Sequence, residues 1–155
     1  MNSPPPPASV QVEQVLPWVT VPLRQKVLRP HQTFAQMSQD GDNDPETAFF
    51  AAYDAAHQVV GTASVRREAS PWGEPGWRLR GMATEPELRG RGIGAAVLAR
   101  VFEHVARLGG GLLWCNARIP AQRFYEREGF VTRGEPWVDP DIGPHIVMHR
   151  QVDSI

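Results

Sequence analysis

The chain contains very little cysteine, a single Cys115 among 155 residues. One cysteine excludes an internal disulfide framework and any metal site built from paired cysteines, and it fits a reducing compartment. The sequence also lacks an apolar run of 18 residues and a signal-peptide-like hydrophobic region. We therefore expect a cytoplasmic protein with no membrane partner.

An excess of charge of either sign is also missing, because 16 basic residues face 17 acidic ones and the formal net charge is −1. This balance gives no reason to expect nucleic acid as a partner. Asp40, Asp42 and Asp44 have the spacing of a calcium loop, but such a loop needs glycine where Pro45 stands and glutamate where Ala51 stands. No metal site is expected.

The hydrophobic pattern predicts one α/β domain over residues 9–155, after a disordered proline-rich tail over residues 1–8. Alternation and turn residues predict strands, and apolar residues at helical spacing predict three helices. The order β-α-β-β-β-α-β-α-β-β calls for a mixed sheet with helices on its faces. The strands are expected at 10–15, 47–53, 58–67, 77–84, 111–117, 130–134 and 145–150, and the helices at 20–30, 93–108 and 119–128.

The richest segment is RGRGIGAAVLARVFEHVARLG at 89–109, where three glycines precede an amphipathic helix. Each glycine costs about 1 kcal/mol relative to alanine inside a helix, so their presence needs a reason. Bare backbone lets a ligand reach the unpaired N–H groups of the first helical turn, where phosphate is the matching anion. The alternative is a tight strand-to-helix turn in which the glycines only relieve strain.

Two familiar phosphate-binding designs do not fit this segment. A nucleotide-binding P-loop needs lysine and then serine or threonine where Ala95 and Ala96 stand. A dinucleotide fingerprint demands a direct strand-to-helix turn and an acidic residue closing the next strand. Here EPEL intervenes, and the next strand ends in Asn116.

The segment LRGMATEPELRGRGIG resembles motif A of the GNAT superfamily of N-acetyltransferases, whose signature Gln/Arg-x-x-Gly-x-Gly/Ala is matched by Arg89, Gly92 and Gly94. CNARIPAQRFYEREGF resembles motif B of the same family, with Asn116 closing a strand and Tyr125 on the following helix. LRGMAT, VLRP and GPHIVM are similar to an uncharacterised bacterial, ElaA-like branch. The resemblance covers about residues 10–150.

This resemblance implies an acyl-CoA acyltransferase fold in which two parallel central strands, 77–84 and 111–117, splay apart. Gly81 inside the first strand indicates a bulge or a close backbone approach. The cofactor implied is acetyl-CoA, with an N–H near Met82 or Ala83 polarising the thioester carbonyl. Asn116 either bonds the pantetheine amide or caps the next helix. The implied cofactor-binding residues are Met82, Ala83, Thr84, Arg89, Gly90, Arg91, Gly92, Ile93, Gly94 and Asn116.

The resemblance also implies direct transfer of the acetyl group to an amine, with Tyr125 as general acid unless it only packs the helix. The glutamate that many members carry before the glycine turn is replaced here by Arg78. His145 is the candidate for acceptor contact or general base, because imidazole titrates near neutrality; a structural histidine and a water chain are the alternatives. Arg80 either binds an acidic acceptor or pairs with a carboxylate. Cys115 is expected to be an inert buried thiol.

The sequence therefore predicts an acetyl-CoA-dependent N-acetyltransferase acting on a small-molecule or peptide amine. The alternative is a coenzyme A-binding sensor or interaction module without turnover. A third alternative is transfer of a longer acyl group, and the analogy with similar proteins suggests a homodimer. Trp72 and Trp137, expected in loops, are candidates for walls of the acceptor pocket.

Overall fold

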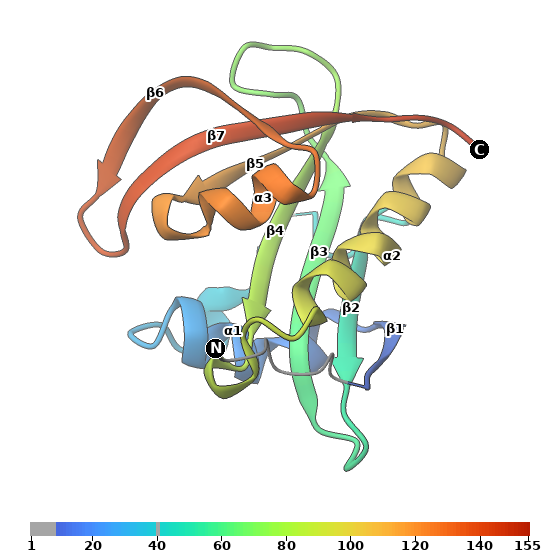
Figure 1. The fold of residues 1–155 in the computed structure, drawn as a ribbon, viewed down its shortest axis with the longest axis vertical. Coiled ribbons are helices and arrows are strands. Elements are labelled where there is room, and N and C mark those ends of the chain that lie inside the picture. The colour runs from blue at the N-terminus through green and yellow to red at the C-terminus, as the bar shows by residue number, and fades with distance from the viewer. Residues whose placement is uncertain (1–8, 40) are drawn as a thin grey trace, which may run out of the picture.

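A mixed sheet in the order β1-β2-β3-β4-β5-β7-β6 forms the centre of the protein (Figure 1). The computed structural model describes residues 9–39 and 41–155, so the tail expected at 1–8 lies outside the described residues. The expected order of strands and helices is confirmed. The strands are β1 (Gln11–Val15), β2 (Ala48–Tyr53), β3 (Val59–Arg67), β4 (Trp77–Thr84), β5 (Gly111–Arg118), β6 (Val131–Asp139) and β7 (Gly143–Val152), and the α-helices are α1 (Val21–Leu28), α2 (Ile93–Arg107) and α3 (Gln122–Arg127).

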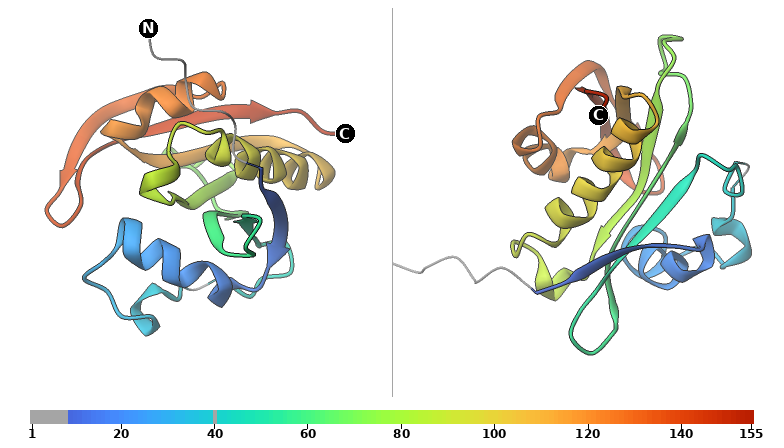
Figure 2. Two further views of the ribbon diagram at one scale, coloured as in Figure 1. Left: turned by 60° about the horizontal axis from the view of Figure 1, so that its bottom comes forward. Right: turned by 90° about the vertical axis from the view of Figure 1, so that its right-hand side faces the viewer.

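The helices α1 and α2 lie on opposite faces of the sheet (Figure 2). Three apolar residues of α2 are fully buried where the helix packs on β2 and β3: Ile93, Val97 and Val101, at 1%, 0% and 0% exposure. Gly61 of β3 lies beneath the first turn of α2, where an added Cβ would come within 2.6 Å of Ile93 Cγ2. This close approach fixes where the helix begins. On the other face, α1 packs on β4 and β3.

The central strands β4 and β5 diverge, as the family resemblance implies. They pair in parallel only at Trp77 with Leu113 and Arg78 with Trp114. Beyond Arg80, the register of β4 against β3 shifts, and Gly81 takes a φ of +62°. This is the bulge expected at Gly81, and it lies where the two strands have separated.

Strand β6 is longer than the expected 130–134, because it continues through Pro136 to Asp139. Proline cannot donate a ladder hydrogen bond, so it is tolerated on edge strands and at bulges. Both conditions hold, since β6 is the last strand of the sheet and its register against β7 shifts between Arg133 and Trp137. Trp137 is therefore in a strand, opposite His145, and not in a loop.

The helix expected over 119–128 is split into two parts. A 3-10 turn, η4 (Ile119–Ala121), precedes α3. Two further 3-10 turns, η1 (Pro17–Thr20) and η3 (Pro86–Leu88), introduce α1 and the glycine segment. Among the residues that the structure describes, no helix combines the length and the apolar character needed to cross a membrane.

Candidate functional site

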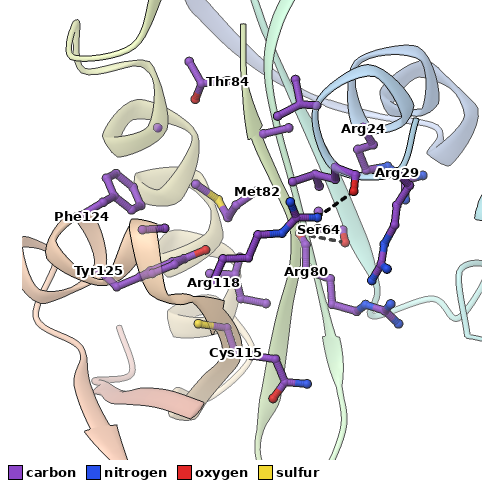
Figure 3. A pocket seen from close by; sticks show the side chains of 18 of the residues that line it. Arg24, Arg29, Ser64, Arg80, Met82, Thr84, Cys115, Arg118, Phe124 and Tyr125 are labelled. Atoms are coloured by element: carbon purple, nitrogen blue, oxygen red, sulfur yellow. Dashed lines mark hydrogen bonds between the residues drawn. The ribbon is translucent and has the colours of Figure 1, made fainter. Parts of the chain in front are cut away.

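A pocket of about 1240 Å³ opens where β4 and β5 separate. Its lining comes from β2, β3, β4, the glycine turn before α2, the end of β5, α3, the C-terminal end of α1 with the segment that follows it, and the β6–β7 hairpin. Figure 3 shows side chains from α1, β3, β4, β5 and α3 converging on one space. The site is therefore assembled from segments far apart in the chain.

The glycine turn leaves the N-terminus of α2 open. Gly92 is the N-cap residue with a φ of +82°, and Gly90 has a φ of +80°. A Cβ at either position would meet no atom within 4 Å. Among the described residues, no acceptor bonds the N–H groups of residues 93–95, and the first N–H paired across this turn is that of Ala96, with Gly92 O at 3.0 Å. The positive φ values agree with glycines that relieve backbone strain in the turn. The open, unpaired N–H groups also agree with a binding site for phosphate.

The two arginines that flank this turn are placed differently. Arg89 is exposed and lines the pocket, whereas Arg91 is half-buried and does not. Neither side chain forms an ion pair within the described part of the chain. Both guanidinium groups can therefore turn toward an anion held at the helix N-terminus.

The end of β4 offers one free backbone edge to the pocket. Ala83 and Thr84 pair with Thr62 and Gly61 of β3, while pairing with β5 ends at Arg78. Met82, Ala83 and Thr84 all line the pocket, as does the exposed Asn116 of β5. Asn116 does not cap the following helix, because the N-cap residues of η4 and α3 are Arg118 and Ala121, without side-chain bonds. The capping alternative for Asn116 is thus not observed.

Tyr125 of α3 is buried at 6% exposure and also lines the pocket. Its ring packs edge-on against Phe124 and Phe130, with centroids 5.2 and 5.4 Å apart. In Figure 3 its hydroxyl points inward, between Met82 and Arg118. Burial, with a smaller contribution from Cys115, raises the pKa of Tyr125 well above its usual value. Tyr125 therefore packs the helix and also brings a protonated hydroxyl to the pocket.

His145 of β7 is buried at 5% exposure and lines the same pocket. Its Nδ1 lies 2.8 Å from the carbonyl oxygen of Gly143. A carbonyl can only accept, so Nδ1 carries the proton and the neutral ring keeps its lone pair on Nε2. Trp137 stacks on the imidazole at 5.5 Å and also lines the pocket, whereas Trp72 lies outside it and packs against Arg133.

The strand position where many family members carry glutamate is occupied by Arg78, which forms an ion pair with Glu68. Arg78 Nη1 lies 2.9 Å from Glu68 Oε2, and Arg66 Nη2 lies 2.7 Å from Glu68 Oε1. Partial burial raises the pKa of Glu68, but the hydrogen bonds and charges of Arg66 and Arg78 outweigh it, so the pKa is lowered overall. Glu68 is held as a paired carboxylate and is poorly suited to accept a proton.

Several pocket arginines were missed by sequence reasoning, because they come from segments that meet only in the fold. Arg118 donates from Nη2 to Leu28 O at 2.7 Å, joining β5 to the end of α1. Arg29 follows that end, and Arg24 packs over Gly81. The only local signal was Arg118 itself, two residues after Asn116 at the end of a buried strand. The arginines lining the pocket are Arg24, Arg29, Arg66, Arg78, Arg80, Arg89, Arg118 and Arg127.

Arg80 of β4 differs from its neighbours because its side chain has no hydrogen bond or ion pair to any described residue. Burial, followed by the charges of Arg78 and Arg66, lowers its pKa to about 10, so it is still cationic at neutral pH. The pairing with a neighbouring carboxylate, one of its two expected roles, is not observed among the described residues.

Comparisons with known proteins point in one direction. A model of the acetyltransferase (GNAT) domain matches residues 45–132. The uncharacterized N-acetyltransferase YitI of Bacillus subtilis (strain 168) is 32% identical over 133 residues, 84% of this chain and 89% of that protein. The crystal structure of Escherichia coli ElaA has a TM-score of 0.75 at 17% identity, over 92% of this chain and 99% of that one. A GNAT superfamily phosphinothricin acetyltransferase from Sinorhizobium meliloti, solved in complex with AcCoA, has a TM-score of 0.72 at 16% identity, over 93% and 89% of the two chains.

Proposed function

This chain belongs to the GNAT superfamily of N-acetyltransferases, and from that membership we propose how its own residues transfer acetyl from acetyl-CoA to an amine. The observation that carries the proposal is the open N-terminus of α2 at the mouth of the gap between β4 and β5. The residues there suit the cofactor, because unpaired N–H groups, bare glycines and two free arginines match a diphosphate. Acetyl-CoA supplies the acetyl group as a reactive thioester.

In this proposal the glycine turn holds the diphosphate and β4 holds the pantetheine arm. The N–H groups of Ile93 and Gly94 point out of the first helical turn, and Arg89 adds a charge-assisted bond. The free edge of Met82, Ala83 and Thr84 pairs with the amides of the arm as an added strand would. A β4 N–H near Met82 then donates to the acetyl oxygen, where negative charge builds during transfer.

Tyr125 acts as the general acid that protonates the departing sulfur. Its hydroxyl has no hydrogen-bond partner among the described residues and lines the pocket beside Met82. Because burial raises its pKa well above the usual value, the phenol keeps its proton at neutral pH. The role needs a proton donor in a water-poor position, and Tyr125 meets both conditions.

His145 is the proposed acceptor of the proton that the attacking amine loses. The Gly143 carbonyl fixes the proton on Nδ1, and Trp137 holds the ring in its plane, so the Nε2 lone pair keeps one orientation. Glu68 does not serve in its place, since it is tied to Arg66 and Arg78.

We expect His145→Gln to lower kcat about 10- to 100-fold, less than a full loss of base catalysis, because water in the pocket can accept the proton in its place. Steady-state kinetics at a fixed pH measures kcat, and calorimetric titration checks that acetyl-CoA still binds. His104→Gln, on α2 and outside the pocket, serves as the control. A wild-type kcat in His145→Gln would remove His145 from the reaction.

Transfer in one step, without an enzyme-bound acetyl group, also predicts an inert Cys115. Burial raises the pKa of this thiol to about 12, so almost none is thiolate at neutral pH. Iodoacetamide should therefore label the native protein negligibly and label it fully in urea, as mass spectrometry would show. Cys115→Ala should retain turnover within about threefold, since cysteine of this kind acts as a small buried apolar residue. Complete inactivation of a folded Cys115→Ala protein would argue for a covalent route.

Release of free thiol from acetyl-CoA in the presence of a panel of amines tests the proposed function. An enzyme of this kind releases thiol in proportion to the acceptor and forms the acetylated amine in equal amount. A coenzyme A-binding sensor, favoured by the Arg78–Glu68 pair at the usual base position, would bind the cofactor and release none. Calorimetric titration of acetyl-CoA in parallel separates these two outcomes.

A further inference from the structure

We infer that the acceptor amine carries an anionic group, a carboxylate or a phosphate, and that Arg80 and Arg29 hold it on the α1 face of the sheet. This inference rests on the proposed acetyl transfer and names its substrate class. It starts from two guanidinium groups that line the pocket and form no hydrogen bond or ion pair with a described residue; the carboxylate of Asp139 acts on Arg29 only through its charge.

The two arginines come from different elements and meet on one side of the sheet. Side chains alternate along β4, so Leu79 enters the core beneath α2 while Arg80 faces the opposite side. Arg29 directly follows α1, which packs on β4 from that side. In Figure 3 the Arg29 side chain extends toward the Arg80 guanidinium.

The charges around Arg80 leave one negative group missing. Arg78, Arg66 and Arg29 all repel its charge, and Glu68 is the carboxylate that attracts it. Glu68, however, is already bound by Arg66 and Arg78. A half-buried cation among like charges is unfavourable until an anion joins it. A carboxylate or phosphate can accept two parallel bonds from the guanidinium fork, which adds orientation to the attraction.

This missing anion is not the cofactor's diphosphate. Arg80 lies four residues before Thr84, about 13 Å along an extended strand, and its side chain points away from the face that carries α2. The glycine turn is at the far end of this path. Arg80 therefore marks a second anion position, on the side of the splayed strands that also carries Trp137 and His145.

Matched amines provide the test. We expect kcat/KM for an α-amino acid to exceed that for its carboxamide at least tenfold, or that for 2-aminoethylphosphonate to exceed that for ethanolamine. The pair that responds identifies the anion as carboxylate or phosphate. In Arg80→Gln the preference should fall toward unity while KM for acetyl-CoA stays near normal. Arg107→Gln, an exposed arginine paired with Glu103 on α2, should keep the full preference.

Binding of inorganic phosphate to the protein saturated with coenzyme A gives a readout independent of turnover. Calorimetry should detect phosphate binding to the wild type and to Arg107→Gln, and at least tenfold weaker binding to Arg80→Gln. The inference is overturned if neutral amines support thiol release as well as their acidic partners do, or if Arg80→Gln binds phosphate as tightly as the wild type. Either result leaves the proposed acetyl transfer standing. Phosphate binding through Arg80 without thiol release from any amine overturns the proposed function instead.

Discussion

Gly92→Glu is expected to weaken acetyl-CoA binding by at least about 100-fold, equivalent to roughly 2.7 kcal/mol. Gly92 is the N-cap residue of α2, and the space where its Cβ would stand is empty. A glutamate there places its carboxylate in front of the unpaired N–H groups that the diphosphate needs. The added negative charge also repels the cofactor. Calorimetric titration of acetyl-CoA into the folded variant measures the effect.

Two controls separate this blocking from simple backbone strain. Gly92→Ala meets the same φ of +82° without a charge, at a cost of about 1 to 2 kcal/mol of stability, and should bind acetyl-CoA within about tenfold of wild type. Gly73→Glu puts the same residue at a φ of +87°, also in open space, in the loop before β4. It should bind normally. Wild-type affinity in Gly92→Glu would mean that the glycines serve only the turn.

The features that the sequence predicted best depend on residues close together in the chain. The turn before α2 follows from Gly90 and Gly92, because glycine is the residue that tolerates positive φ and leaves backbone bare. The bulge in β4 follows from Gly81 for the same reason. In both cases one residue type has one local conformational consequence, and no knowledge of the tertiary fold is needed.

The acceptor side of the pocket could not be predicted in this way. Leu28 and Arg118, joined by a hydrogen bond, are 90 positions apart, and their meeting depends on how α1 packs on β4 and where β5 ends. Trp137 was expected in a loop because Pro136 interrupts the strand pattern. The strand nevertheless continues through this proline, because β6 is at the edge of the sheet. The pairing of Glu68 with Arg66 and Arg78, which removes the obvious carboxylate base, is likewise visible only in three dimensions.

Tyr125→Phe is expected to lower kcat by about 100- to 10,000-fold, the range typical of losing a general acid. Phenylalanine keeps the edge-on contacts with Phe124 and Phe130, so the packing of α3 and the affinity for acetyl-CoA should stay near normal. Steady-state kinetics gives kcat, and calorimetry gives the affinity. Tyr53→Phe is the matched control, because Tyr53 is the other tyrosine of the chain and stacks on His57 outside the pocket.

The pH dependence of the wild type adds a second requirement for Tyr125. A general acid works only while it holds its proton, and burial raises the pKa of this phenol well above the ordinary value of about 10. The raised pKa therefore predicts that activity persists at alkaline pH. Up to about pH 10, kcat should not fall through loss of the tyrosine proton. An undiminished kcat in Tyr125→Phe would reduce Tyr125 to a packing residue. The sulfur would then have to take its proton from water or from the acceptor itself, and the geometry of α3 would no longer be tied to the reaction.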